Sequence, residues 1–134
     1  MLNWSIHGFW DFSVSGVVIY LLIVTHITIV SVTVYLHRFS AHRSLLLNAP
    51  ISHFFRFWLW LTTGQGTRDW TAIHRKHHAE CETTEDPHSP VKQGLGTILW
   101  RGVEAYKLAI ADQETVRRYG RGCPDDWLEK NLYC

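Results

Sequence analysis

A long stretch without any charged side chain constrains the fold more than any other feature of this sequence. No Asp, Glu, Lys or Arg occurs between Phe12 and His37, and the 23 residues from Val14 to Leu36 are almost wholly apolar or hydroxylic. As a helix they would span ~35 Å, which is enough for a hydrocarbon core of ~30 Å. We therefore predict one transmembrane helix at about residues 14–36.

Two other structures explain this run less well. A buried helix of a soluble domain would have to be covered on all sides by the remaining residues, and about 100 residues can hardly do so. A signal peptide would carry Lys or Arg before the run and a small-residue cleavage site after it, and the sequence has neither. The run is best interpreted as a membrane span.

The charges on either side of the run predict its orientation. Asp11 is the only charged side chain before it, whereas three arginines follow it: Arg38, Arg43 and Arg56. The positive-inside rule places the C-terminal side in the cytoplasm, where cysteines stay reduced. Trp4 and Trp10 would then lie in the outer interface of an inner or plasma membrane.

A second apolar run, Ile51–Thr63, has only 13 residues and contains Arg56. Its length as a helix is ~20 Å, too short to cross a bilayer and typical of interfacial segments. Its Phe and Trp side chains suit the headgroup boundary. We predict an interfacial aromatic helix at about residues 51–63; the alternative is a core helix of a soluble domain.

The remaining residues, about 64–134, have the character of a cytoplasmic part built from helices. Apolar residues recur at helical spacing and turn residues separate the segments. The expected helices are Thr67–Glu80, an amphipathic Ile98–Ala111, Gln113–Tyr119 and a short one after Cys123–Asp126. The predicted fold class is an all-α membrane protein with one transmembrane helix, one interfacial aromatic helix and cytoplasmic helices that carry histidines.

Composition excludes several classes of function. Lys+Arg 13 against Asp+Glu 12 gives a net charge of +1, so nothing favours binding to nucleic acid. The three cysteines show no CxxC spacing, which argues against a disulfide framework and a thiolate zinc finger.

Histidines form two clusters. His37 and His42 follow the predicted span, while His74, His77 and His78 form an HxxHH motif. Positions i, i+3 and i+4 of a helix share a face, so the second cluster can converge on one metal region. His37 and His42 lie ~140° apart around a straight α-helix, so they need a helix break or two different metals.

The short second run places both clusters on the same, cytoplasmic side of the membrane. A zinc protease would need HExxH, and a Cys/His zinc site would need paired cysteines; neither occurs here. Haem takes two axial ligands, fewer than the five clustered histidines. An all-imidazole set suits a metal that handles O₂, because thiolates oxidise near a strong oxidant.

The motifs resemble those of the membrane fatty acid desaturases with histidine boxes, especially the bacterial acyl-CoA/Δ9 type. The matching stretches are THITIVSVTVYLHRFSAHRS (Thr25–Ser44), HFFRFWLWLTTG (His53–Gly64), WTAIHRKHHAECETTEDPHSP (Trp70–Pro90) and CPDDWLEKNLY (Cys123–Tyr133). The resemblance covers the chain from about Thr25 to its end.

The resemblance implies a centre of two non-haem irons that uses O₂ and two electrons to desaturate a long-chain fatty acyl group. It implies iron ligands at His37, His42, His74, His77 and His78, with Asp86 and His88 near the site and no catalytic residue beyond the ligands. The implied partners are membrane lipid, an acyl-CoA or acyl-lipid substrate and an electron-transfer protein.

The family pattern also includes a third box, again HxxHH, and no histidine follows His88. Residues 1–134 therefore resemble the N-terminal part of a desaturase domain, and we expect them to be inactive alone and to require a C-terminal desaturase segment. The alternatives are one half of a split enzyme or a non-catalytic, truncated membrane remnant. Hydroxylation by the same type of centre is the nearest enzymatic variant.

Other polar side chains are given structural roles. His26 lies within the span and is expected to hydrogen-bond to another helix, while His7 and His53 are structural or interfacial. Cys81 is interpreted as a bystander thiol. Five cations are expected to form a solvated surface, although they could also meet anionic headgroups: Arg101, Lys107, Arg117, Arg118 and Arg121.

Overall fold

The computed structural model describes residues 13–133, and within that range the chain is helical with no strand. This confirms the predicted all-α class. The elements are α2 (Val14–Ser31), the π-helix η1 (Val32–Ala41), α3 (Ala49–Thr63), α4 (Thr67–Ala79), α5 (Pro90–Gln93), α6 (Leu95–Ala111), α7 (Gln113–Tyr119) and α8 (Trp127–Asn131). His7, Trp4 and Trp10 lie outside the described residues.

The α2 and η1 helices form one continuous rod of 28 residues, Val14–Ala41, that is long and apolar enough to cross a membrane. The Ser13 hydroxyl begins the rod by accepting a hydrogen bond from the Gly16 N–H at 3.2 Å. Only 6% of its most apolar window is buried, so it is not the core helix of a soluble domain. The helix continues past Leu36, because the polar residues that follow keep their backbone bonds in π geometry.

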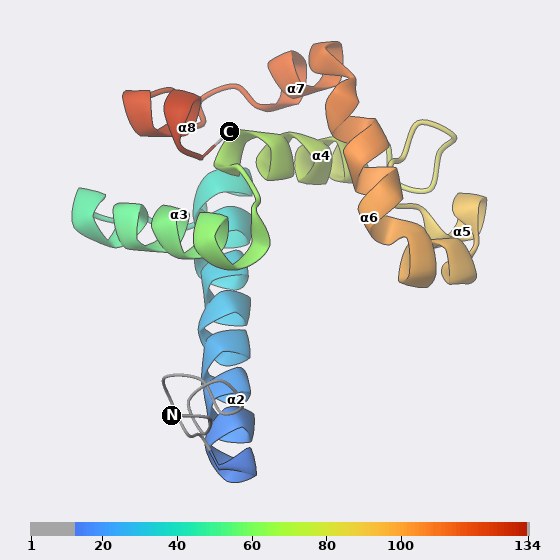
Figure 1. Cartoon of the computed structure of the whole chain (residues 1–134). Helices are drawn as coiled ribbons and strands as arrows, with labels where there is room; N and C mark the ends of the chain where they lie inside the picture. Colours follow the sequence, from blue (N-terminus) through green and yellow to red (C-terminus); the bar gives the residue numbers. More distant parts are fainter. Residues whose placement is uncertain (1–12, 134) are drawn as a thin grey trace.

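The other helices gather around the C-terminal end of this rod (Figure 1). The α3 helix runs across the rod, α4 lies over its end, and α5 and α6 lie on the side opposite α3. Asn48 caps α3 by accepting from the Ile51 N–H at 3.1 Å, and Gly64, with φ of 65°, ends it. A crosswise orientation is what an interfacial helix would have beside a transmembrane rod.

The largest buried apolar side chains meet where η1 contacts α3 and α4. Tyr35, Leu36 and Leu59 are fully buried there, and Phe55 and Trp70 pack around them. Tyr35 stacks on Phe55 with ring centroids 6.1 Å apart. This small core fixes the end of the rod against the two helices that follow it.

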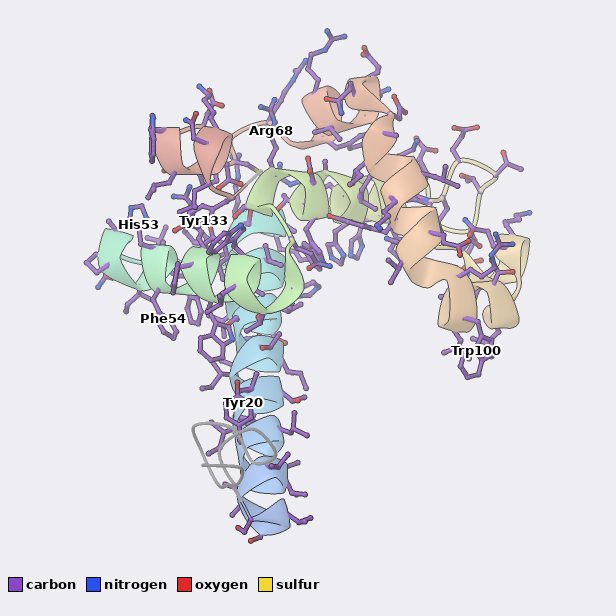
Figure 2. The ribbon with its side chains drawn as sticks, in the orientation of Figure 1. Tyr20, His53, Phe54, Arg68, Trp100 and Tyr133 are labelled. Atoms are coloured by element: carbon purple, nitrogen blue, oxygen red, sulfur yellow. The ribbon has the colours of Figure 1, made fainter. Side chains whose placement is uncertain are left out.

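An ion-pair cluster of two buried side chains, Arg56 and Glu129, with the partly exposed Asp126, joins α8 to α3. The guanidinium of Arg56, only 4% exposed, donates to both Asp126 oxygens at 2.7 and 2.8 Å and to Glu129 Oε2 at 2.8 Å. Tyr133 lies against the same guanidinium, with its ring centroid 5.1 Å away, and points from the C-terminal segment toward α3 (Figure 2). Glu129 Oε1 accepts from the Thr67 N–H at 3.0 Å and thereby caps α4.

The cytoplasmic helices fall close to the predicted ranges. The Gln113–Tyr119 helix has the predicted bounds, α4 ends one residue earlier than expected, and α6 begins three residues earlier. On α6 the face toward the rest of the chain carries the half-buried Tyr106 and Ile110. Ile98 is half-buried as well. The other large apolar side chains of α6 are exposed, including Trp100, which projects from the helix in Figure 2.

Candidate metal centre

Four of the five predicted ligands lie together. His37 and His42, from η1 and its C-cap, face His74 and His78 of α4, and one nitrogen from each lies within 4.8 Å of the others. Ring centroids are 4.5 Å apart for His37 and His42, and 4.6 Å apart for His74 and His78. We call these four residues the four-histidine cluster.

The π-helix brings His37 and His42 together. The His42 N–H donates to the His37 carbonyl at 3.0 Å, the i→i+5 bond that defines a π turn. Residues five positions apart, which would diverge on an α-helix, therefore lie on one face, and their rings meet edge to face with an interplanar angle of 73°. Of the two alternatives considered above, a helix break is not needed, because the wider turn itself brings the two residues together. Such π segments frequently occur at functional sites.

Two buried hydroxyl pairs hold α4 against η1 beside the cluster. Tyr35 and Thr67 share a hydrogen bond of 3.3 Å, and Ser40 and Thr71 share one of 2.7 Å. On η1, Tyr35 and Ser40 are five positions apart, which is about one π turn. On α4, Thr67 and Thr71 are four positions apart, which is about one α turn. These pairs set the register in which the two histidine-bearing helices meet.

Burial and the neighbouring imidazoles disfavour protonation of two members of the cluster, His74 and His42. Burial, reinforced by the neighbouring imidazoles, lowers the pKa of His74 to about 4. Burial and the nearby His37 lower the pKa of His42 as well. Neutral imidazoles have a free lone pair for a metal, and the Nε2 atoms of His74 and His78 are already 3.1 Å apart. The donor set therefore fits a transition metal that prefers nitrogen ligands.

An aromatic ring covers part of this site. Trp70 lies one turn before His74 on α4, and its ring stacks on the imidazole with centroids 4.6 Å apart. Stacking on Trp70 restricts the rotation of His74 and covers one face of its ring. Trp70 is a site residue that the spacing of histidines could not reveal.

His77 lies beside the four-histidine cluster and is held by a different partner. Its Nδ1 is 2.8 Å from Asp86 Oδ1, and its ring centroid is 6.5 Å from that of His74. An imidazole fixed through Nδ1 to a carboxylate presents Nε2 as the free donor. The expectation that spacing alone would place all three α4 histidines in one group is thus met by His74 and His78 only.

Asp86, which orients His77, is itself held by several hydrogen bonds. It is 2% exposed and also accepts the N–H groups of His88 at 2.9 Å and Glu82 at 3.0 Å. Burial opposes its ionisation, but the hydrogen bonds from His77 and the two backbone groups outweigh burial and lower the pKa of Asp86. The DPHS loop therefore carries a fixed negative charge next to His77.

The remaining candidates lie away from the cluster or at its margin. His88 is near His77, with ring centroids 6.2 Å apart, and burial lowers the pKa of His88. Cys81 Sγ lies within 4.8 Å of ligand atoms of His77 and Asp86. His26 and His53 are exposed. Of the five cations on α6, α7 and the following loop, Arg101 and Arg117 pair with Glu104 and Glu114 on the surface.

Comparison with known proteins adds independent information. A family model described as "Fatty acid desaturase" matches residues 13–122. The chain is 38% identical over 96 residues to the Delta-9 desaturase-like 5 protein of Arabidopsis thaliana, covering 68% of this chain and 29% of that protein.

Two further relatives come from other organisms. The Hex-5-enoyl-[acyl-carrier protein] acetylenase of Moorena producens is 35% identical over 89 residues, covering 65% of this chain and 27% of that protein. The sn-1 stearoyl-lipid 9-desaturase of Synechocystis sp. is 27% identical over 97 residues, covering 72% of this chain and 29% of that protein. The chain thus spans less than a third of the length of these relatives. No solved structure matches it.

Proposed function

The chain belongs to the fatty acid desaturase family, and on that premise we propose that it supplies iron ligands for the O₂-dependent desaturation of a long-chain fatty acyl group. One observation carries the proposal. Four imidazoles, each offering a nitrogen within 4.8 Å of the others, lie at the end of a helix long and apolar enough to cross a membrane. A nitrogen-rich site at the membrane surface suits chemistry on a membrane-borne acyl chain.

The proposed ligands are His37, His42, His74, His77 and His78. When bound there, a pair of non-haem irons would supply the oxidising power that removes two hydrogens from an unactivated acyl chain, using O₂ and two electrons. The chain's own residues prepare the site. Burial keeps His74 unprotonated near neutral pH, Trp70 restrains its ring, and Asp86 orients His77.

The substrate class follows from the family and from the position of the site. The names of the relatives include a stearoyl-lipid desaturase and an acetylenase acting on an acyl-carrier protein, so the acyl carrier varies among similar proteins. For this chain we propose a long-chain acyl group carried as acyl-CoA or acyl-lipid, with electrons delivered by a separate electron-transfer protein. The proposed orientation places the histidines on the cytoplasmic side of the membrane.

We further propose that residues 1–134 alone do not desaturate. Five imidazoles are too few to hold two irons with the defined geometry that oxygen activation needs. Among residues 13–133 one helix is long and apolar enough to span a membrane, and we propose that this helix and the short amphipathic segments are too little to enclose a dry channel for an acyl chain. The missing ligands would come from a desaturase segment that carries a third HxxHH box.

Co-expression tests this function. A desaturase-deficient host would express residues 1–134 alone, or together with a desaturase segment carrying the third box, and gas chromatography would measure its fatty acids. We expect monounsaturated chains only with both segments, and none when His37→Ala replaces the wild type.

His53→Ala is the matched control, because His53 is exposed and lies away from the cluster. It should retain activity. Failure of every combination would favour the non-catalytic remnant. Unsaturated products from residues 1–134 alone would contradict the need for a second segment.

A further inference from the structure

We infer that Arg75 is the positioning residue that fixes the distance between the two histidine-bearing helices; the inference rests on the proposed metal-binding function. Arg75 lies on α4 directly after His74 and two residues before His77. The motif that supplies the histidines therefore also supplies a cation, and none of the roles described above uses it.

The guanidinium of Arg75 bonds to four backbone carbonyls from two other parts of the chain. Nε donates to the Ala41 carbonyl at 3.1 Å and Nη2 to the Ser40 carbonyl at 2.7 Å. Nη1 donates to the carbonyls of Tyr119 and Arg121, both at 2.9 Å. One side chain thus joins α4 to the end of η1 and to the segment that follows α7.

Three of these acceptors lie at helix C-termini, and the fourth, the Arg121 carbonyl, also accepts from Arg43 at 3.3 Å. Ser40 and Ala41 are the last residues of η1, and Tyr119 is the last residue of α7. Their carbonyls therefore accept no hydrogen bond within their own helices. Helix C-termini carry partial negative charge and favour a positive partner. Arg is permanently charged and its planar fork reaches several acceptors at once, whereas the ammonium of Lys is a single point.

The bonds of Arg75 flank the ligands. Ala41 directly precedes His42, and Arg75 directly follows His74, so the bond between Arg75 and Ala41 joins the neighbours of two cluster histidines. The His42 and His74 rings are 5.4 Å apart. A small shift of η1 relative to α4 would change that separation, and metal ligands tolerate little displacement.

The other contacts between α4 and η1 help to define the role of Arg75. Thr67, Thr71 and Arg75 recur every four residues along α4, and each bonds to η1 or to its end. Thr67 and Thr71 are buried, whereas Arg75 is half-buried and is directly adjacent to His74 in the chain. Loss of the guanidinium should therefore loosen the metal site more than the fold.

The test uses the full chain in detergent micelles, with Co²⁺ as the probe and its visible absorption as the signature of ligand geometry. The variants are Arg75→Lys and Arg75→Gln, with Arg68→Lys as the matched control on the same helix and His37→Ala as the ligand control. We expect Arg75→Lys to weaken Co²⁺ binding about tenfold or more and to alter the shape of the absorption band, as loss of a ligand-supporting contact does. Arg68→Lys should match the wild type.

The helical circular dichroism of Arg75→Lys should stay at the wild-type level. A collapse of that signal would overturn the inference, because Arg75 would then determine the fold and not the site. An unchanged Co²⁺ affinity and spectrum in both Arg75 variants would also overturn it, while leaving the proposed function intact. If the wild-type chain gave no Co²⁺ spectrum that depends on His37, the four-histidine cluster would not bind metal in this chain and this inference would be overturned, whereas the proposed function is tested separately by the co-expression experiment.

Discussion

Replacing Arg56 by Met should destabilise the chain far more than the same change at a surface ion pair. The side chains of Arg56 and Glu129 are 4% and 9% exposed, so removal of the guanidinium leaves a buried carboxylate without its counter-charge. Met keeps most of the apolar stem of Arg, which limits the loss of packing against Tyr133. The expected effect is therefore mainly electrostatic.

The structure indicates that Arg56→Met lowers the free energy of unfolding by an amount near the lower end of the range for broken buried ion pairs. Breaking a buried ion pair by removing one partner costs about 3–5 kcal/mol. Glu129 Oε1 would still accept the Thr67 N–H at 3.0 Å, and Asp126, 46% exposed, would be hydrated. We therefore expect Arg56→Met to lower the free energy of unfolding by about 3 kcal/mol.

Denaturant unfolding in dodecyl maltoside, followed by circular dichroism, measures this loss. Arg101→Met is the matched control: Arg101 pairs with Glu104, but the two side chains are 69% and 61% exposed, so the cost should stay below about 1 kcal/mol. Adding Glu129→Gln to Arg56→Met should recover part of the loss, because it removes the stranded charge. Equal effects of Arg56→Met and Arg101→Met would refute the reasoning.

Three further outcomes are expected. The Arg56 guanidinium holds the pKa of Asp126 well below its ordinary value of 3.8. The ion pair therefore stabilises the fold fully at pH values above 3.8, and this stability is lost as the pH falls through the lowered pKa. Acid unfolding should be less steep in Asp126→Asn, and equal pH profiles would contradict the assignment. Thr71→Val, which removes a fully buried partner of Ser40, should cost about 1–3 kcal/mol in unfolding free energy, and a neutral effect would show that the pair does not hold α4. A reporter fused after Cys134 should be cytoplasmic and one fused at the N-terminus should not, whereas a periplasmic C-terminal reporter would place the histidines on the wrong side.

Helices were predictable where local rules decide the structure. Asp112 caps α7 by accepting the Glu114 N–H at 3.1 Å, and Gly120 follows its last residue; both signals are visible in the sequence. The apolar run before Leu36 likewise predicts a helix without any tertiary contact. Short-range propensity and capping were sufficient in these segments.

The π-helix was not predictable from the residues that form it. Val32–Ala41 has no composition that distinguishes i→i+5 from i→i+4 bonding. Its geometry depends on partners outside the segment: Thr67 and Thr71 on α4 match the five-residue spacing of Tyr35 and Ser40. The conflict between the His37–His42 spacing and a straight α-helix was visible, but its resolution required the tertiary structure.

The direction of individual side chains was the other feature that could not be predicted from the sequence. The spacing of His74, His77 and His78 predicts a shared helix face, yet His77 turns toward Asp86, which lies in a loop nine residues later. Arg56 was interpreted only as a charge within an interfacial run, because its partners are 70 and 73 residues away along the chain. Neither contact leaves a local pattern that could be recognised in advance.

The cap that Glu129 provides has a consequence for the timing of synthesis. Glu129 lies 62 residues after the Thr67 amide that it accepts, so a ribosome adding about 5–20 residues per second needs about 3–12 s between the two. During that interval α4 has already been made, but the Thr67 N–H lacks its Glu129 acceptor and Arg56 lacks its carboxylate partners. Metal loading is therefore expected after residue 129 has emerged, and a nascent chain stalled before that point should hold metal poorly.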